Sequence, residues 1–281
     1  MIFHRLFVWF QHVLPQHALS RLVLRATRVR APWFKNWLIR GFMRLYTIDM
    51  SETVQPEPSS FGSFNEFFTR ALKPDVRSVA GGLGEIACPV DGAISEAGKI
   101  DGANLLQAKG RHYTLDELLA LRGWAKHFEG GSFATIYLAP FNYHRVHMPL
   151  KGRLRETVYV PGRLFSVNAA TASLVPRLFA RNERVLTWFD TEFGEFALIL
   201  VGALNVGSIA TVWAGDITPA SGRVPAALPP QEVSLEKGEE LGRFNMGSTV
   251  ILLFQKDRAR WNDELRAGTT VRLGQSLGHL T

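Results

Sequence analysis

Two strand-like runs separated by a polar turn decide how this sequence folds. They are Val185-Leu-Thr-Trp-Phe189 and Phe196-Ala-Leu-Ile-Leu-Val201, with Asp190 to Glu195 between them. Runs rich in β-branched and aromatic residues and bounded by turn residues are typical of β-strands. Further runs of the same kind predict more strands, at residues 133–138, 154–160, 206–213, 249–254 and 270–273.

Helices are expected before these strands. Residues 1–60 contain two or three short helical segments and end in a polar, proline-containing linker. Ser63-Phe-Asn-Glu66 and Thr114-Leu-Asp-Glu117 are capping-box patterns, which predict short helices continuing through Leu72 and Leu121. Helices followed by many strands favour an α+β fold with a mostly antiparallel β core.

The basic charge of the chain is concentrated at its N-terminus. The net charge of the 281 residues is +7, and residues 1–46 alone carry +8 with no Asp or Glu. The rest of the chain is therefore nearly neutral, which argues against a nucleic-acid-binding protein. The single cysteine, Cys88, excludes an internal disulfide and any zinc site built from several cysteines.

Bulky apolar residues recur at helical spacing in this basic segment. No apolar run reaches the roughly 20 residues needed to span a bilayer. Basic amphipathic helices with aromatic residues lie in the interface of anionic membranes, so residues 1–60 are expected to form membrane-surface helices. Alternatively, these helices pack on the core or on a partner subunit, with their arginines in solvent. The apolar residues are Phe3, Leu6, Phe7, Phe10, Val13, Leu14, Trp33, Phe34, Trp37, Leu38 and Phe42.

Two short motifs carry side chains that are common in active sites. Tyr143-His-Arg-Val-His-Met-Pro149 places His144 and His147 three residues apart, and Pro89-Val-Asp-Gly92 places Asp91 at a turn. Taken alone, the motifs are typical of hydrogen-bonded loop histidines and an ordinary turn aspartate. A metal site formed by the three side chains is the alternative, although the chain lacks an HExxH motif and cysteine ligands.

Gly247-Ser248 precedes an apolar strand and is a pair that can undergo self-cleavage. Once deprotonated, the Ser248 hydroxyl can attack the Gly247 carbonyl and move the acyl group from nitrogen to oxygen. The resulting ester can eliminate to dehydroalanine, which hydrolyses to a pyruvoyl group and ammonia. A tight turn before a strand is the ordinary interpretation of the same residues.

Six motifs occur in a fixed order along the chain. They are Pro89-Val-Asp-Gly-Ala-Ile-Ser95, Tyr143-His-Arg-Val-His-Met-Pro149, Pro161-Gly-Arg-Leu-Phe-Ser-Val-Asn168, Phe179-Ala-Arg-Asn-Glu-Arg184, Val206-Gly-Ser-Ile209 and Gly247-Ser-Thr249. Together they closely resemble the bacterial phosphatidylserine decarboxylase family of the pyruvoyl type. The resemblance covers residues 61–281, and residues 1–60 match only as a basic amphipathic leader. Asn142 and Met246 stand where the family often has aspartate and leucine.

The resemblance implies an activity and a set of catalytic residues. It implies a proenzyme that cuts itself between Gly247 and Ser248 and converts Ser248 into a pyruvoyl cofactor. The mature enzyme is then expected to decarboxylate phosphatidylserine to phosphatidylethanolamine and CO2 through a Schiff base with that group. Asp91, His147 and Ser248 are expected to form the triad for self-cleavage. His144 is expected to return a proton to the α-carbon after CO2 leaves.

The resemblance also implies a substrate site, partners and a location. Phe165 and Val167 are expected to wall the pocket and Ser166 to contact the serine head group, with no metal. Expected partners are phosphatidylserine, an anionic membrane surface, the two chains of the cut proenzyme and a second copy in a homodimer, with no nucleic acid. Residues 61–281 form the catalytic domain, bound peripherally at the cytoplasmic face of the cell membrane. The alternatives are a binding protein without catalysis, a metal hydrolase and a pyruvoyl decarboxylase of a soluble amino acid.

Overall fold

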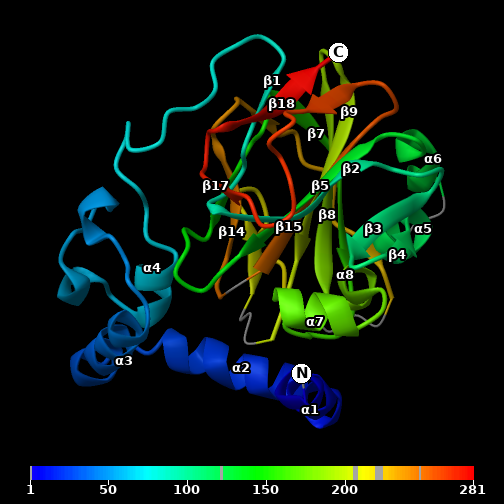
Figure 1. Ribbon diagram of the computed structural model, residues 1–281. Helices are drawn as coiled ribbons and strands as arrows, with labels where there is room; N and C mark the ends of the chain where they lie inside the picture. Colours follow the sequence, from blue (N-terminus) through cyan, green and yellow to red (C-terminus); the bar gives the residue numbers. More distant parts are fainter. Residues whose placement is uncertain (1, 121–122, 205–207, 219–223, 247) are drawn as a thin grey trace.

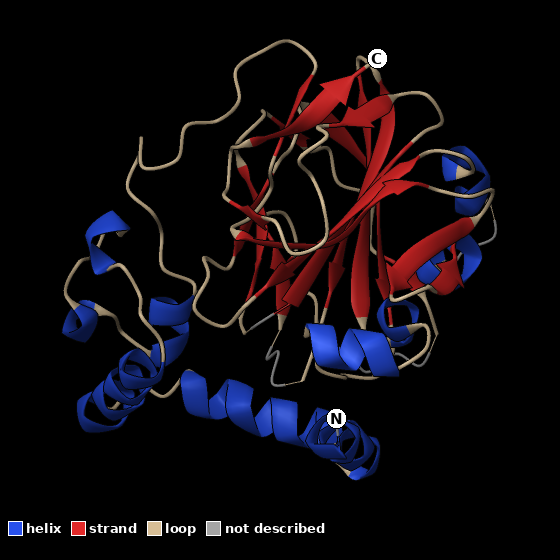
Figure 2. Cartoon of the chain, in the orientation of Figure 1, coloured by secondary structure: helices blue, strands red, loops and turns tan. Residues whose placement is uncertain are grey.

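Three helices at the N-terminus lie across one end of a large β-sheet (Figure 1, Figure 2). The computed structural model describes residues 2–120, 123–204, 208–218, 224–246 and 248–281. The first helices are α1 (Ile2–Val13), α2 (Gln16–Thr27), α3 (Pro32–Leu45) and α4 (Phe64–Phe68), with 3-10 turns at Met50–Glu52 and Pro58–Ser60. The later helices are α5 (Leu115–Leu119), α6 (Trp124–Phe128), α7 (Ala169–Leu174) and α8 (Leu178–Arg181).

The largest sheet has nine strands and is antiparallel at every pairing. Its order is β12-β7-β8-β9-β15-β5-β2-β17, and β13 also pairs with β7. The strands are β2 (Gly92–Lys99), β5 (Ser132–Leu138), β7 (Gly152–Val160), β8 (Arg184–Thr191), β9 (Gly194–Val201), β12 (Ala226–Ala227), β13 (Ser234–Leu235), β15 (Ser248–Phe254) and β17 (Thr270–Val271). The strand β15 therefore lies in the middle, between β9 and β5.

Three smaller antiparallel sheets complete the described part of the chain. The first contains β1 (Glu85–Ala87), β18 (Ser276–Leu280) and β16 (Ala259–Trp261). The second contains β11 (Gly215–Asp216), β10 (Ile209–Thr211), β14 (Glu240–Phe244) and β6 (Arg145–His147), and the third pairs β3 (Asn104–Ala108) with β4 (Arg111–Thr114). The predicted α+β class with a mostly antiparallel core is confirmed.

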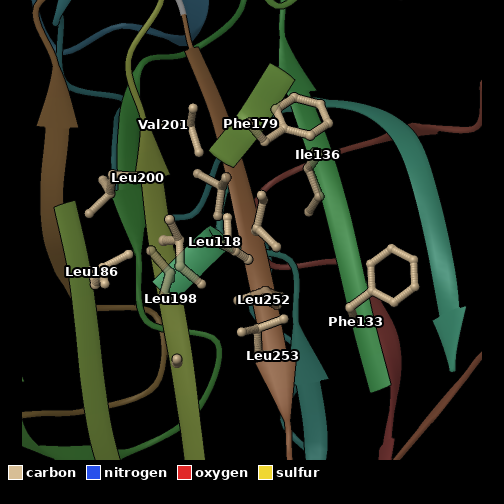
Figure 3. Close-up of a cluster of buried hydrophobic side chains, with 14 of the residues drawn as sticks. Leu118, Phe133, Ile136, Phe179, Leu186, Leu198, Leu200, Val201, Leu252 and Leu253 are labelled. Atoms are coloured by element: carbon tan, nitrogen blue, oxygen red, sulfur yellow. The ribbon is translucent and has the colours of Figure 1, made fainter. Parts of the chain in front are cut away.

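The main core consists of apolar side chains from the central strands of the large sheet. Figure 3 shows part of this cluster, with Leu198 and Leu200 of β9 beside Leu252 and Leu253 of β15. Every residue of β15 is buried, which explains why residues 249–254 form a continuous apolar run rather than an alternating one. Each fully buried side chain of this size contributes about 1.5–3 kcal/mol through removal from water.

A second, smaller apolar cluster joins the N-terminal helices to the body of the protein. Its buried members are Ile39 of α3 together with Phe61, Phe64, Phe67 and Phe68. Met246, which immediately precedes the expected cleavage pair, packs against the same cluster. The position of Met246 is therefore coupled to the packing of α3 on α4.

The two capping boxes behave differently. At Thr114 the box is complete, because the side chain accepts from Glu117 N and the Glu117 carboxylate accepts from Thr114 N. At Ser63 the hydroxyl caps Glu66 N, but the Glu66 carboxylate accepts from Gly62 N instead. Both predicted helices are too long. The first ends at Phe68 and the second at Leu119; Leu121 lies outside the described residues.

Several strands also begin or end at other residues than the sequence predicts. The strand predicted at 270–273 ends at Val271, because Leu273 N donates to the Asp91 carboxylate at 2.8 Å instead of to a neighbouring strand. The strand predicted at 206–213 is described only as β10, and Val206 lies outside the described residues. The run expected from Leu154 starts earlier, at Gly152.

Candidate active site

Ser248 begins the central strand β15 and lies opposite Leu138, the last residue of β5. Its side chain is buried, and its Oγ has no hydrogen-bond partner among the described residues. A buried hydroxyl left unpaired costs about 1–3 kcal/mol, so such a group in a well-packed core calls for a functional explanation. Gly247, the other side of the expected cleavage site, lies outside the described residues.

His144 is completely buried and stacks on Phe68 of α4, with ring centroids 4.1 Å apart. Its Nε2 lies 3.2 Å from the carbonyl of Pro140, which fixes the proton on Nε2 because a carbonyl can only accept. Its Nδ1 has no partner among the described residues. Burial lowers the pKa of His144 to about 3. The imidazole is therefore neutral near pH 7 and has a free lone pair on Nδ1.

His147 lies in β6, and both of its ring nitrogens are engaged. Its Nδ1 is 2.8 Å from the carbonyl of Gly238, and its Nε2 is 3.0 Å from the hydroxyl of Tyr143. The carbonyl can only accept, so Nδ1 carries the proton and Nε2 accepts from Tyr143. Burial lowers the pKa of His147 below its ordinary value. A neutral imidazole with its lone pair on Nε2 has the form that a general base requires.

Asp91 is held by Arg77 rather than by a histidine. Its two carboxylate oxygens accept from Arg77 at 2.7 and 3.2 Å, and one also accepts from Leu273 N at 2.8 Å. Arg77 also donates to Glu52 at 2.8 Å. The bond to Asp91 raises the pKa of the guanidinium further. Among the described residues, no hydrogen bond joins the side chains of Asp91 and His147.

The sheet register nevertheless brings the expected triad residues to one end of the molecule. Tyr137 of β5 pairs with Ala93 on one side and with Thr249 on the other. Asp91 and Ser248 therefore flank the end of β5, with backbones about 10 Å apart across two strand spacings. His147 joins them through its backbone, because its N–H donates to the carbonyl of Pro89 at 2.9 Å. His144 joins the Ser248 side, since its carbonyl accepts from Phe244 N at 3.0 Å.

The segment from Pro161 to Asn168 lies at the same end of the sheet. Its Phe165 is fastened by Asn182, which accepts from Phe165 N at 3.1 Å and donates to Phe165 O at 2.8 Å. The Asn182 amide also donates to Gly202 O at 2.9 Å, and the preceding Val201 pairs with Thr249. Phe165 and Val167 are buried, and their role as pocket walls stays a prediction.

Two buried glutamines of the N-terminal helices hold this segment from outside. Gln11 of α1 accepts from Ser166 N at 2.7 Å, and Gln16 of α2 accepts from Leu164 N at 2.9 Å. The ring of His12 also lies 4.8 Å from that of Phe165. The helices therefore bond directly to the loop predicted to contact the substrate.

A pocket of about 190 Å³ opens beside Asp91 and Tyr143. Arg70, Arg77 and Asn142 also line it. The side chain of Asn142 accepts from Ala139 N at 2.8 Å, so it closes the turn before His144 as an aspartate would. The pocket combines charged walls with an aromatic hydroxyl, which suits a small polar group carrying both signs of charge.

The sequence did not single out several residues that organise this site. Tyr143 and Asn182 lie inside two of the six motifs, but the motifs alone give these residues no role. Arg77 and Gln11 carry no local signal, because their partners are distant in the sequence. Within the described residues, no group of three or more His, Cys, Asp or Glu side chains is placed to hold a metal ion. Asp91, His144 and His147 each bond to other groups instead.

Comparison with known proteins gives matches over nearly the whole chain. A family model described as phosphatidylserine decarboxylase matches residues 64–279, and a second, described as PSD, matches residues 6–47. The phosphatidylserine decarboxylase proenzyme of Methylococcus capsulatus is 54% identical over 277 residues, which is 98% of this chain and 96% of the relative. The proenzyme of Azotobacter vinelandii is 50% identical over 281 residues, covering 98% of each chain. That of Bordetella bronchiseptica is 52% identical over 280 residues, covering 97% of this chain and 94% of the relative.

The buried serine and the two neutral histidines at the end of the sheet define a class of protein, an enzyme equipped for nucleophilic and acid–base chemistry. The matches narrow this class to carboxy-lyases. The chain belongs to the phosphatidylserine decarboxylase family. The family resemblance inferred from the six motifs is thereby confirmed.

Proposed function

We propose that this chain is a proenzyme that cuts itself between Gly247 and Ser248 and then decarboxylates phosphatidylserine to phosphatidylethanolamine. The buried hydroxyl of Ser248 carries the proposal, because it has no hydrogen-bond partner among the described residues at the start of a central strand. The family membership of the chain supports both the substrate and the reaction. Self-cleavage converts Ser248 into a pyruvoyl group at the N-terminus of a 34-residue small chain, residues 248–281.

Self-cleavage begins when a base removes the proton from Ser248 Oγ. The oxygen then bonds to the Gly247 carbonyl carbon, the Gly247–Ser248 amide bond breaks, and the nitrogen takes up a proton. Elimination from the resulting ester releases the Gly247 carboxylate and leaves dehydroalanine. Water converts dehydroalanine into the pyruvoyl group and ammonia. Ser248 suits these steps, because its hydroxyl has no hydrogen bond to another described residue that must be broken before it reacts.

His147 is the base in this proposal, with Asp91 as the third member of the triad. The Gly238 carbonyl holds the His147 proton on Nδ1 and leaves the lone pair on Nε2 for the serine. Nε2 must exchange the Tyr143 hydroxyl for that of Ser248. Direct support from Asp91 requires a second exchange, in which the carboxylate leaves Arg77 for the imidazole. The negative charge of Asp91 favours the imidazolium that forms.

His144 handles the proton of the decarboxylation step. A pyruvoyl group supplies an electron sink for the pair of electrons left behind when CO2 departs. His144 is neutral in the free protein, so it receives its proton from the substrate ammonium at Nδ1 and later returns it to the α-carbon. The Pro140 carbonyl keeps the ring in the orientation that leaves Nδ1 free. The buried Phe165 and Val167 keep water out, which favours loss of a charged carboxylate as CO2.

Residues 1–60 hold the catalytic domain, residues 61–281, at an anionic membrane surface in this proposal. Of the described helices, none is long and apolar enough to cross a bilayer. Apolar side chains project from α1 to α3 beside seven arginines and one lysine. A basic helix with exposed aromatic residues binds at the interface of anionic lipids. Peripheral attachment at the cytoplasmic face and a homodimer belong to the same proposal. The exposed apolar residues are Leu6, Phe7, Trp9, Phe10, Val13, Leu22, Val29, Trp33, Trp37 and Leu45.

Intact-mass spectrometry under denaturing conditions tests the proposal. The expected result is two chains split between Gly247 and Ser248, with the small chain carrying a pyruvoyl group in place of its N-terminal serine. Ser248→Ala is the matched control, and it should give one uncut chain with no decarboxylase activity and an undiminished Tm. The Tm should hold because the missing hydroxyl made no hydrogen bond. A wild-type chain that stays whole would overturn the proposal, and turnover of free serine in place of the lipid would reassign the substrate.

A further inference from the structure

Arg70, just after α4, is a buried arginine with unused hydrogen-bond donors. Only 5% of its surface is exposed, yet its Nε and Nη1 have no partner among the described residues. Its Nη2 makes one long contact, 3.4 Å to the carbonyl of Phe141. Burial lowers its pKa. A guanidinium carries five N–H donors, so most of its capacity for binding an anion is free.

The other arginine buried to this degree, Arg184, shows what a structural arginine looks like in this protein. It is 2% exposed, and all three of its side-chain nitrogens donate to backbone carbonyls at 2.6–2.9 Å. Those carbonyls belong to Glu117, Leu118, Ala180 and Asn182. Among the described residues Arg70 has no such set of carbonyls, and its guanidinium lies over the Phe67 ring, 5.8 Å from the ring centroid. Its N–H donors are therefore largely unused in the free protein.

Arg70 stands where two pockets meet. One is the 190 Å³ pocket beside Asp91 and Tyr143, and the other has about 250 Å³. Arg145 and Arg243, cross-strand neighbours of β6 and β14, also line the second pocket. The charge of Arg70 also contributes to lowering the pKa of His144, which places the guanidinium within electrostatic reach of that imidazole. An anion bound to Arg70 would therefore lie next to the candidate catalytic residues.

A serine phospholipid offers two anions to such a site, its carboxylate and its phosphodiester. The carboxylate must lose its charge as CO2 departs, so a buried cation bonded to it would stabilise the reactant and slow the reaction. The phosphodiester keeps its charge throughout, and guanidinium groups bind phosphate oxygens in a bidentate manner. The chemistry therefore favours the phosphodiester as the ligand of Arg70.

We propose that Arg70 binds the phosphodiester of the lipid head group through its guanidinium, and so positions the serine amine and carboxylate beside His144 and Ser248. This inference rests on the proposed function and adds the residue that recognises the head group. Arg145 and Arg243 also line the 250 Å³ pocket, together with Glu66, and Arg145 is paired with Glu240 at 2.8 Å. Substrate and product carry the same phosphodiester, so Arg70 binds both.

Arg70→Met tests the assignment, because methionine fills space without charge or donors. The variant should cut itself fully and keep a Tm at or above that of the wild type, since it removes a buried charge. Its KM for dihexanoyl phosphatidylserine should rise at least about tenfold. Its Kd for dihexanoyl phosphatidylethanolamine, measured calorimetrically on the processed enzyme, should rise by a similar factor. Arg70→Lys should recover part of both affinities, and Arg266→Met, a change at an exposed arginine, should alter none of these values.

Each result that would contradict the proposal can be told apart from the others. An unchanged Kd for phosphatidylethanolamine beside a raised KM would move the contact to the carboxylate and overturn the phosphodiester assignment. A lowered Tm with unchanged lipid affinities, or loss of self-cleavage, would make Arg70 a structural residue. A wild-type chain that neither cuts itself nor decarboxylates the lipid would overturn the proposed function. Unchanged KM and Kd in a processed, active Arg70→Met enzyme would overturn only the role of Arg70.

Discussion

The central strands of the sheet and the N-terminal helices differ in which side chains they turn inward. Strand β15 buries an unbroken apolar run between β9 and β5. Helices α1 and α2 instead bury polar residues, among them Gln11 and Gln16, and leave large apolar residues exposed. An amphipathic helix on a protein in water normally does the reverse. The difference teaches that the sheet is held by exclusion of water, whereas these helices are attached largely by hydrogen bonds and leave their large apolar side chains exposed.

The largest expected effect is a loss of vesicle binding when exposed aromatic residues of the N-terminal helices are removed. Trp33 and Trp37 of α3 are 75% and 63% exposed, so the double variant Trp33→Ser with Trp37→Ser costs the fold little. Burial of each side chain in lipid contributes about 1.5–3 kcal/mol, so binding to phosphatidylserine vesicles should weaken at least about 100-fold. Cosedimentation measures the binding, and intact mass should still show complete self-cleavage. Leu83→Ser, at a residue 94% exposed in a loop, is the control that should bind as the wild type does. Equal binding by all three proteins would remove the contrast between helices and sheet.

A smaller effect is expected from the hydrogen bonds that attach the helices. Gln16→Leu leaves the buried Leu164 N–H without its acceptor, which should lower the free energy of unfolding by about 1–3 kcal/mol in urea. Gln275 makes a comparable bond to Arg272 N in an exposed position, so Gln275→Leu should cost less than about 0.5 kcal/mol. Equal losses at the two sites would show that polar attachment is no stronger than ordinary surface bonding.

The smallest effect is expected on the sheet side, where His144 is buried and His147 is half-buried, both as neutral imidazoles. Burial lowers the pKa of His144 to about 3, so below pH 6.5 the unfolded chain takes up a proton that the folded chain refuses. Stability should therefore fall as the pH drops, and this histidine should account for about 1 kcal/mol between pH 7.5 and 6.0. Urea midpoints at the two pH values measure the loss. His144→Phe should shrink it, and an unchanged loss in that variant would mean that His144 is not the group responsible.

The sequence predicted best those parts of the fold whose signal is local. The apolar runs at 196–201 and 249–254 become β9 and β15, because a strand buried on both faces must be apolar throughout. Strand β2, Gly92-Ala-Ile-Ser-Glu-Ala-Gly-Lys99, was missed, since it contains glycines and polar residues and is held by pairing with β5. Pairing with a distant residue also explains why α4 ends at Phe68. Leu72 lies beyond the helix and forms a β-bridge with Thr53.

The candidate site shows a similar division. The resemblance located Ser248, His144 and His147 by their order along the chain, and the sheet brings these residues to one end. It did not indicate that Asp91 bonds to Arg77 or that His147 bonds to Gly238, because these pairs lie 14 and 91 positions apart. Burial of Arg70 without partners is also a property of three-dimensional packing. The order of the motifs therefore predicts the reacting groups, but it does not predict the residues that hydrogen-bond to those groups and fix their orientation.

The central position of β15 sets the order of folding and cleavage. Its register with β5 and β9 must be established while residues 1–281 are still one chain, because the connected chain brings its own last strands to the sheet. Once the chain is cut before Ser248, the same sheet can be rebuilt only by the meeting of two separate polypeptides, which depends on concentration. A cut enzyme that unfolds in dilute solution is therefore not expected to return. Its lifetime depends on how slowly the sheet opens, rather than on a folding equilibrium.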